Sequence, residues 1–286
     1  MPYAFFITKE VNMNKLKKLA AIITSALLML SAALPLSASE PVNIRLNGRD
    51  TEIGALLIGT TTYVPFDSAN DALSYGTAEI SGNASEMSSV SPFASIKATE
   101  DDCYIEAEGR YFGGSNSVVI SGMLYVPVRS LAKAYGAEVS WDDSTRSVDL
   151  YSEKSEVITH GDSYYRADEV YWLSRIIHAE SNGEPMNGKI MVGNVILNRV
   201  ASDEFPNTIY SVIFDTEHGV QFTPTANGTI YNTPDEESII AAKICLDSYY
   251  ISRTAMYFLN PALATSFWVP NNRPYLTTIG SHDFYA

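Results

Sequence analysis

The spacing of apolar residues changes once along this chain of 286 residues, at residues 152–166. In residues 39–151, short runs in which apolar and polar residues alternate are separated by turn signals, a pattern typical of β-strands. In residues 167–286, apolar residues first recur at helical intervals, and an aromatic, proline-containing stretch of loop and short strand then follows. The segment between the two is polar and weakly patterned, and we interpret it as a linker. The pattern therefore predicts an α+β fold of two domains, strand-rich first and mainly helical second.

The strand-rich region contains an internal repeat at an offset of about 61 residues. The segment IRLNGR at 44–49 matches IEAEGR at 105–110, and YVPF at 63–66 matches YVPV at 125–128. Each copy predicts a strand, a turn, a second strand and a short helix that ends at a glycine. The region is therefore expected to contain two degenerate copies of one unit.

Two further segments of this region have distinct patterns. Val139 and Trp141 alternate with polar residues before a turn, and Val148 and Leu150 alternate after it, which predicts a hairpin. Residues 81–100 are rich in Ser, Ala and Gly-Asn, and we expect them to form an insertion or loop between the copies.

The second copy, GMLYVPVRSLAKAYGAEVSWDDSTRSVDLY at 122–151, resembles the copper amine oxidase N-terminal-like domain, and the first copy, TTTYVPFDSANDALSYG at 60–76, is a degraded version of it. The resemblance implies a stalk-like or wall-contacting module in residues 39–151, with a plain spacer as the alternative. Copper binding is not implied, because the region has no cluster of His and Cys residues.

The first 38 residues have the pattern of a secretion signal. Lys15, Lys17 and Lys18 precede an apolar run at 19–34, and small residues up to Ala38 follow, which predicts cleavage after Ala38. A retained membrane anchor is the alternative, although the run is shorter than the ~20 residues that span a bilayer. Translation could also begin at the second methionine, Met13.

The charge of the chain argues against several classes of partner. The chain has 19 Lys and Arg and 33 Asp and Glu residues, and its net charge is −14. Without residues 1–38, which hold four lysines and one glutamate, 15 basic and 32 acidic residues remain, a net charge of −17. Non-specific nucleic-acid binding and attachment to anionic membranes both need clustered Lys and Arg, and no such cluster follows residue 18. We therefore expect an exported protein that binds neither nucleic acid nor a membrane after cleavage.

The patterns of metalloenzymes and nucleophilic hydrolases are absent from the sequence. The four histidines form no HExxH motif, and His178-Ala179-Glu180 lacks the P-C-x-x-C partner found in zinc deaminases. There is no G-x-S-x-G motif. Cys103 and Cys245 lie in different predicted domains, and we interpret them as buried thiols rather than a disulfide. No metal or other cofactor is therefore expected.

The most informative residue of the helical region is Glu180. The first helix is predicted to begin at Asp168 as its N-cap, and its apolar face holds Leu173, Ile176 and Ile177. Glu180 shares that face. Burial raises the pKa of a carboxyl group, and a general acid needs such a raised pKa to hold a proton near neutral pH. The alternative is a structural carboxylate bonded to the backbone or to Arg175 or Arg199.

Other polar residues of this region have structural interpretations. A second helix is predicted at about 188–200, where Asn194 and Asn198 are expected to satisfy buried backbone groups. A third helix is predicted to begin at a capping box, Thr233-Pro234-Asp235-Glu236, with proline at the first helical position. Glu184 follows Glu180 by four residues, but Gly183 and Pro185 interrupt the helix, so we expect it to brace the turn.

Four segments of the helical region carry a family resemblance: LSRIIHAESNGEPMNGKIMVGNVILNRV at 173–200, FPNTIYSVIF at 205–214, QFTPTANGTIYNTP at 221–234, and AMYFLNPALATSFWV with TIGSHDFYA within 255–286. Through them, residues 170–286 resemble the cell wall hydrolase family named after the spore cortex-lytic enzyme SleB. The resemblance implies a lysozyme-like, mainly helical fold that cuts the glycan strands of peptidoglycan, with Glu180 as the catalytic glutamate.

Five residues in these segments have side chains suited to holding sugars. Their amides would bind hydroxyl and N-acetyl groups, and their aromatic faces would stack on rings; simple core packing is the alternative for the two aromatic residues. The expected substrate-binding residues are Gln221, Phe222, Tyr257, Asn260 and His282.

The count of carboxylates bears on the reaction. Ordinary glycosidases use two acids, whereas a lytic transglycosylase uses one, and no residue has a clear claim to be the second. We therefore expect Glu180 to act first as acid and then as base, cleaving between N-acetylmuramic acid and N-acetylglucosamine in spore cortex or vegetative wall. The alternatives are a hydrolytic muramidase, or a non-catalytic wall-binding or scaffold protein. An amidase would need zinc ligands that the sequence does not supply.

Overall fold

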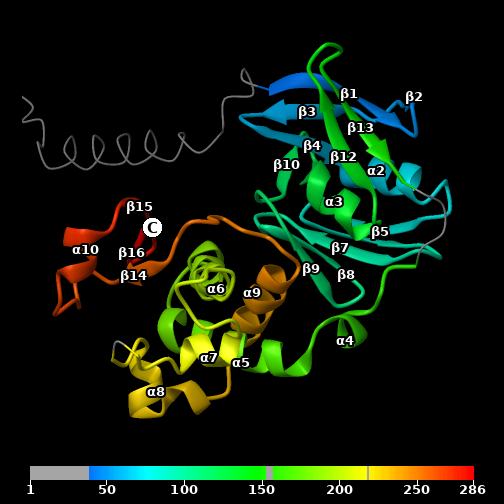
Figure 1. The fold of residues 1–286 in the computed structure, drawn as a ribbon. Helices are drawn as coiled ribbons and strands as arrows, with labels where there is room; N and C mark the ends of the chain where they lie inside the picture. Colours follow the sequence, from blue (N-terminus) through cyan, green and yellow to red (C-terminus); the bar gives the residue numbers. More distant parts are fainter. Residues whose placement is uncertain (1–38, 153–156, 218) are drawn as a thin grey trace, which may run out of the picture. The chain divides into compact units, whose positions relative to one another are not determined.

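The computed structural model describes residues 39–152, 157–217 and 219–286 (Figure 1). The predicted signal segment and the two candidate start sites lie outside the described residues. Residues Pro41–Ala286 form one compact unit. Among the residues that the structure describes, no helix is both long and apolar enough to cross a membrane.

The strand-rich region begins with an eight-stranded sheet in the order β10-β11-β4-β3-β1-β13-β12, with β2 paired to β1. The predicted hairpin is present, because β12 and β13 pair antiparallel with Trp141 opposite Val148. β13 also pairs in parallel with β1, so the two ends of this region meet in one sheet. The strands are β1 (Ser39–Leu46), β2 (Arg49–Asp50), β3 (Ala55–Ile58), β4 (Thr61–Pro65), β10 (Val118–Ile120), β11 (Met123–Pro127), β12 (Glu138–Asp142) and β13 (Ser147–Tyr151).

A second sheet has five strands in the order β5-β6-β7-β8-β9. Its first three strands occupy most of residues 81–100, so the expectation of an insertion or loop there was wrong. Strand propensity is weak in this Ser- and Gly-rich segment, but pairing with neighbours and burial of Ser89 and Ile96 override it. The strands are β5 (Glu79–Asn83), β6 (Glu86–Val90), β7 (Ser95–Thr99), β8 (Tyr104–Ala107) and β9 (Arg110–Gly113).

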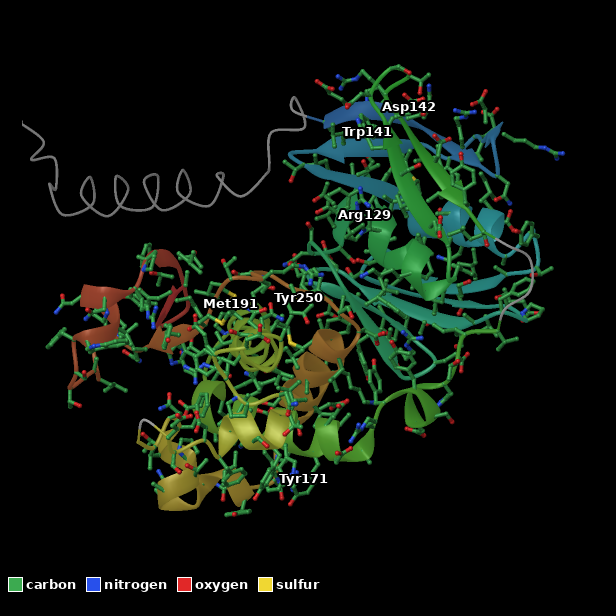
Figure 2. The ribbon with its side chains drawn as sticks, in the orientation of Figure 1. Arg129, Trp141, Asp142, Tyr171, Met191 and Tyr250 are labelled. Carbon is green, nitrogen blue, oxygen red and sulfur yellow. The ribbon has the colours of Figure 1, made fainter. Side chains whose placement is uncertain are left out.

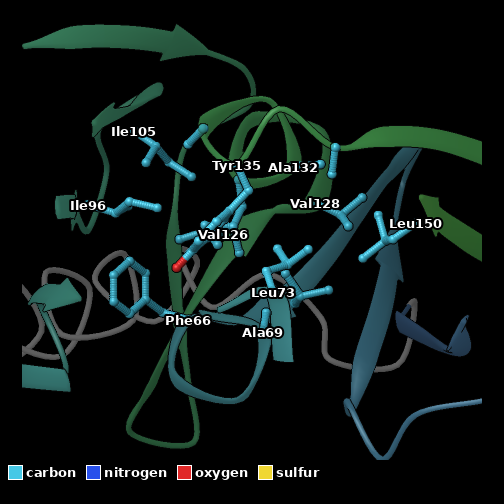
Figure 3. Packing of buried hydrophobic residues seen from close by; sticks show 14 of the residues in the cluster. Phe66, Ala69, Leu73, Ile96, Ile105, Val126, Val128, Ala132, Tyr135 and Leu150 are labelled. Atoms are coloured by element: carbon cyan, nitrogen blue, oxygen red, sulfur yellow. The ribbon is translucent and has the colours of Figure 1, made fainter. Parts of the chain in front are cut away.

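The internal repeat appears in the structure as a symmetric strand pair. The two Tyr-Val-Pro segments pair antiparallel in β4 and β11, with Val64 opposite Val126. Each strand leads directly into a short helix, α2 (Phe66–Leu73) or α3 (Val128–Ala134). Figure 3 shows side chains of both helices meeting those of β7 and β8 in one apolar core. Gly136 follows α3 with a φ of 65°, which allows the chain to leave the helix as the sequence predicts.

The helical region is built on three helices that pack on one another, α5 (Ala167–Ser181), α6 (Met186–Val200) and α9 (Glu236–Leu246). They approach closely at Gly193, where an added Cβ would lie 2.7 Å from the Sγ atom of Cys245. Shorter elements surround them: α4 (Gly161–Tyr164), α7 (Ile209–Ile213), α8 (Thr223–Asn227) and the 3₁₀ helix η2 (Thr229–Tyr231).

Two predicted helix starts were wrong by two residues each. Arg166, not Asp168, occupies the N-cap of α5, and Asp168 lies in the first turn, where its charge still favours the helix dipole. Asp235, not Thr233, caps α9 and accepts a hydrogen bond of 2.8 Å from the backbone N–H of Ser238. Asp235 caps because its short carboxylate reaches that amide.

The C-terminal segment forms a small antiparallel sheet in the order β14-β16-β15. Its strands are β14 (Tyr257–Leu259), β15 (Tyr275–Ile279) and β16 (His282–Tyr285), and α10 (Trp268–Asn272) lies between β14 and β15. The buried Phe284 anchors this sheet to the apolar core of the helical region.

The two regions pack against each other through β9 and α9. Arg110 on β9 donates a hydrogen bond of 3.2 Å from Nε to Asp247 at the end of α9, and the hydroxyl of Tyr165 also bonds to Asp247. Tyr249 donates to the carbonyl of Gly114 at 3.1 Å. The predicted linker is not wholly irregular, because it contains α4. Since residues of both regions belong to one compact unit, the division into two domains stays a prediction.

Candidate active site

Glu180 lies in the last turn of α5, and the packing of that helix decides its environment. Leu173, Ile176 and Ile177 on the same face are fully buried in the core. Glu180 itself is half-buried, and burial raises the pKa of its carboxyl group to about 7. A carboxyl group with this pKa is protonated in about half of the molecules at pH 7 and can release and regain its proton, as a general acid and base must.

The structure does not support the alternative of a structural carboxylate. Glu180 makes no hydrogen bond or ion pair within the described parts of the chain. Arg175 instead donates to the carbonyl of Tyr171 at 3.4 Å and stacks on its ring, while Arg199 donates from Nε to the carbonyl of Met256 at 2.8 Å. The carboxyl group of Glu180 is therefore available to a substrate.

A cavity of about 710 Å³ opens beside Glu180. All six residues singled out from the sequence line it. They come from separate segments: α5, the segment before α8, β14 with the residue that follows it, and the start of β16. Those residues are Glu180, Gln221, Phe222, Tyr257, Asn260 and His282.

The side chains differ in how much of their polar surface remains for a ligand. The Gln221 amide donates to the carbonyl of Gly219 at 3.1 Å, and its oxygen has no bond to any residue that the structure describes. The Oδ1 of Asn260 accepts from the backbone N–H of Ala262 at 2.9 Å, which leaves its NH₂ group for a ligand. Phe222 is buried, so its ring is mostly a wall of the core, as the packing alternative expected. Tyr257 accepts from Arg273 at 2.9 Å and is half-buried.

His282 faces the cavity from the start of β16 and is almost wholly buried. Burial lowers the pKa of its imidazole, although Glu184 and Asp283 oppose this effect. Its ring packs edge-on against Phe258 at a centroid distance of 5.4 Å. His282 is therefore neutral at neutral pH, and it offers a substrate a neutral hydrogen-bonding group rather than a charge.

Glu184 is a second carboxylate that lines the same cavity. Burial alone would raise its pKa, but hydrogen bonds from the backbone N–H and hydroxyl of Ser281 lower it below the ordinary value. Glu184 was expected to brace the turn in which it lies, next to Gly183 and Pro185. Its carboxylate instead braces the turn at Ser281, which is distant in the sequence. Glu180 and Glu184 thus place a carboxyl group of raised pKa and one of lowered pKa at one site.

Arg199, in the last turn of α6, is a site residue that the sequence analysis did not identify. It lines the cavity, is only 5% exposed, and its Nη1 has no hydrogen-bond partner among the described residues. Its guanidinium lies over the rings of Phe205, Phe222 and Tyr257 at 4.8 to 5.2 Å. Burial lowers its pKa to about 10, so it keeps its charge. The sequence analysis named it only as a possible partner of Glu180, and its one signal was an arginine near the end of a helix that is apolar on most sides.

Lys189 is a second missed residue, and it positions the end of α5. Its side chain is 1% exposed, and Nζ donates to the carbonyls of Asn182 at 2.8 Å and Glu184 at 2.9 Å. Nζ also lies 3.0 Å from a carboxylate oxygen of Glu237 on α9. This lysine therefore ties the turn after Glu180 to the rest of the helical core.

Several polar residues have structural roles. Asn194 and Asn198 bond to backbone groups of residues 249–255, as the sequence predicts. His178 accepts a hydrogen bond from the backbone N–H of Asp235 at 3.3 Å.

In the described ranges, no group of three His, Cys, Asp or Glu residues could hold a metal ion. Cys103 and Cys245 are free and buried, as expected, and burial raises the pKa of both thiols.

Comparison with known proteins supports the two resemblances. The family described as Cell Wall Hydrolase matches residues 183–285, and the family described as Copper amine oxidase N-terminal domain matches residues 109–197. The second match covers the second copy of the repeat and overlaps the first match within α6.

Curated relatives match the C-terminal region. A spore cortex-lytic enzyme of Bacillus cereus is 38% identical over 120 residues, which are 42% of this chain and 45% of the relative. That of Halalkalibacterium halodurans is 36% identical over 129 residues, 45% of this chain and 38% of the relative. The chain therefore spans less than half the length of these curated relatives.

Two solved structures also match. The catalytic domain of the germination-specific lytic transglycosylase SleB from Bacillus anthracis is 36% identical, with a TM-score of 0.39 over 45% of this chain and 100% of that one. The catalytic domain of the Bacillus cereus SleB protein is 35% identical, with a TM-score of 0.39 over 47% of this chain and 100% of that one. The family matches and the curated relatives show a cell wall hydrolase domain in residues 183–285, similar to the spore cortex-lytic enzymes, and a copper amine oxidase N-terminal-like domain within residues 109–197.

Proposed function

We propose that this protein is an exported lytic transglycosylase that cuts the glycan strands of peptidoglycan between N-acetylmuramic acid and N-acetylglucosamine. One observation carries the proposal: an unpaired glutamate with a pKa of about 7 lies on a cavity of about 710 Å³. The family of the C-terminal region supports the substrate class. Spore cortex and vegetative wall are both candidate substrates.

In the proposed reaction, Glu180 supplies both proton transfers. Its carboxylic acid protonates the glycosidic oxygen, the C1–O bond of N-acetylmuramic acid breaks, and N-acetylglucosamine leaves with a free 4-hydroxyl group. The resulting carboxylate accepts the proton of the muramyl 6-hydroxyl group as O6 bonds to C1. The product is a 1,6-anhydro ring, and Glu180 regains its proton without consuming water.

The other groups of the cavity have complementary roles in this proposal. The amides of Gln221 and Asn260 and the neutral imidazole of His282 bind hydroxyl and N-acetyl groups. The buried charge of Arg199 binds an anionic or carbonyl oxygen of the muramyl substituent, because its Nη1 has no hydrogen-bond partner among the described residues. Tyr257 offers its ring to a sugar face.

One observation favours a second candidate, a hydrolytic muramidase. Glu184 is an ionised carboxylate in the same cavity, and a carboxylate that activates water is what hydrolysis adds to the single-acid scheme. Its bonds to Ser281 already occupy that carboxylate, which favours the transglycosylase. A third possibility is a wall-binding protein without activity.

The test is to incubate the protein with vegetative and cortex sacculi and to identify soluble products by mass spectrometry. Anhydro-muropeptides are expected from the wild type, and Glu180→Gln should release none. Reducing muramic ends would instead show hydrolysis, and their loss in Glu184→Gln would make Glu184 the second acid. If neither sacculus releases products, the wall-binding alternative replaces the proposal.

A further inference from the structure

A second cavity, of about 540 Å³, lies in the strand-rich region between α3 and strands β4 and β12. Figure 2 shows Arg129 and Trp141 on this part of the molecule, and both line the cavity. The side chains that matter to the argument are Thr61, Ser115, Arg129, Lys133, Ser140 and Trp141. We call this the α3 groove.

The α3 groove has an unusual charge for this protein. Arg129 and Lys133 are one helical turn apart on α3, and both are exposed. Neither forms an ion pair with any residue that the structure describes. No Asp or Glu lines the groove, although acidic residues outnumber Lys and Arg by 33 to 19 in the chain. Two cations without an ion pair among the described residues make a local site for an anion, because the Asp143 carboxylate at the edge of the groove bonds to Trp141 rather than to either cation.

An aromatic ring and hydroxyl groups complete the α3 groove. The indole of Trp141 is half-buried, and its Nε1 donates to Asp143 at 2.6 Å, which holds the ring in place. A fixed aromatic face packs well against the C–H face of a sugar or an aliphatic chain. Thr61 and Ser115 lie on the rim with their hydroxyl oxygens 2.9 Å apart, and Ser140 adds another hydroxyl group.

We propose that the α3 groove binds the peptide stems of peptidoglycan, with Arg129 and Lys133 holding a stem carboxylate and Trp141 packing on the adjoining sugar or aliphatic side chain. This inference rests on the proposed function, because it assumes that the same polymer is the substrate. The protein and the stems are both acidic, so attraction over the whole surface is unfavourable and a local cationic site is needed. Binding one polymer at two sites raises the effective concentration of glycan at Glu180.

The test measures binding to sacculi freed of teichoic acid, by co-sedimentation of the full chain carrying Glu180→Gln, so that bound wall is not cut. The variant adds Arg129→Gln and Lys133→Gln. The matched control adds Arg49→Gln and Arg253→Gln, which remove the same charge outside the groove. A second set of sacculi is stripped of stems by an amidase. Thermal unfolding checks that all variants are folded.

We expect the groove variant to bind whole sacculi about fivefold more weakly than the control, a change of about 1 kcal/mol in binding free energy, since exposed charge pairs each contribute little. On stem-free sacculi the two variants should bind alike. Equal binding to whole sacculi would overturn the proposal. An equal loss of binding on stem-free sacculi would also overturn it, since the groove would then bind glycan. A loss of binding seen only when teichoic acid is restored would overturn it as well, since the groove would then bind phosphate.

The groove proposal and the proposed function fail in different ways. If the chain with native Glu180 releases no product but the groove variant still loses stem-dependent binding, the groove stands and the enzyme assignment falls. If product is released and the groove variant binds as strongly as the control, the enzyme assignment stands and the groove proposal falls.

Discussion

The backbone N–H of Ser281 donates a hydrogen bond of 2.8 Å to the carboxylate of Glu184, and this contact joins the turn after α5 to the turn between β15 and β16. The side-chain hydroxyl of Ser281 bonds to the same carboxylate. The contact holds the sheet that carries His282 beside the helix that carries Glu180. It therefore shapes the cavity from two segments that are far apart in the sequence.

Replacing Glu184 by Gln should destabilise the protein and reduce its sensitivity to acid. Hydrogen bonds to a charged group contribute about 1.5–3 kcal/mol, and the amide recovers part of this. Because the pKa of Glu184 is lowered in the folded state, its contribution is present above the unfolded pKa and is lost as pH falls through the folded value. Urea unfolding should show that, as pH falls from 7 to 3, the free energy of unfolding decreases less in Glu184→Gln than in the wild type. An unchanged acid profile would contradict the proposed contact.

The rate of glycan cleavage should fall as pH rises through about 7. Glu180 must be protonated to act as the acid, and burial raises its pKa to about 7. Single-turnover rates on soluble glycan strands from pH 5 to 9 test this, with Asn227→Asp on the exposed end of α8 as a control outside the cavity. Glu180→Gln should lower the rate at least about 100-fold at every pH. A rate that stays level to pH 9 would show that another group supplies the proton.

The same pKa implies that Glu180 weakens the fold at alkaline pH. A carboxyl group with a raised pKa binds its proton more tightly in the folded state, so stability is highest below the unfolded pKa and declines as pH rises to about 7. Glu180→Gln removes this loss and should be about 1–3 kcal/mol more stable than the wild type at pH 8. At pH 4 the two should be equally stable. Equal stability at pH 8 would mean that Glu180 is solvated in solution.

Replacing Arg199 by Met should weaken substrate binding more than it slows the chemical step. The proposal gives the buried Nη1 of Arg199 a substrate oxygen as its partner, and such a charged hydrogen bond is worth about 1.5–3 kcal/mol. KM for soluble glycan strands should rise about tenfold or more, with a smaller change in kcat, and Arg199→Lys should recover part of the affinity. A fall in kcat with KM unchanged would contradict this, and would mean that Arg199 contacts the transition state rather than the bound substrate.

Part of this fold and site could be predicted from sequence because the signals are local. Apolar spacing on one helix face identified Glu180 as a carboxyl group in an apolar setting. The repeat predicted the two Tyr-Val-Pro strands and the short helices that follow them, although it did not predict that the two strands pair with each other. The strands within residues 81–100 gave no such signal, because their pairing partners, not their own propensities, hold them.

The rest of the site depends on contacts between distant segments. Asn260 and His282 were identified only through the family resemblance, since helical or strand periodicity does not place them beside Glu180. Arg199 and Lys189 sit on a helix that is apolar on most sides, so the pattern shows burial but not which cavity or turn each side chain reaches.

The contact between Arg110 and Asp247 should contribute strongly to the stability of the whole unit. Both side chains are largely buried, at 14% and 2% exposed, and Asp247 also bonds to Tyr165. Removing one partner of a buried pair leaves an uncompensated charge, which costs about 3–5 kcal/mol, so Arg110→Met should lower the free energy of unfolding by that order. The double variant Arg110→Met with Asp247→Leu removes both charges and should regain most of the loss. If the two single losses simply add in the double variant, β9 and α9 are not joined through this pair.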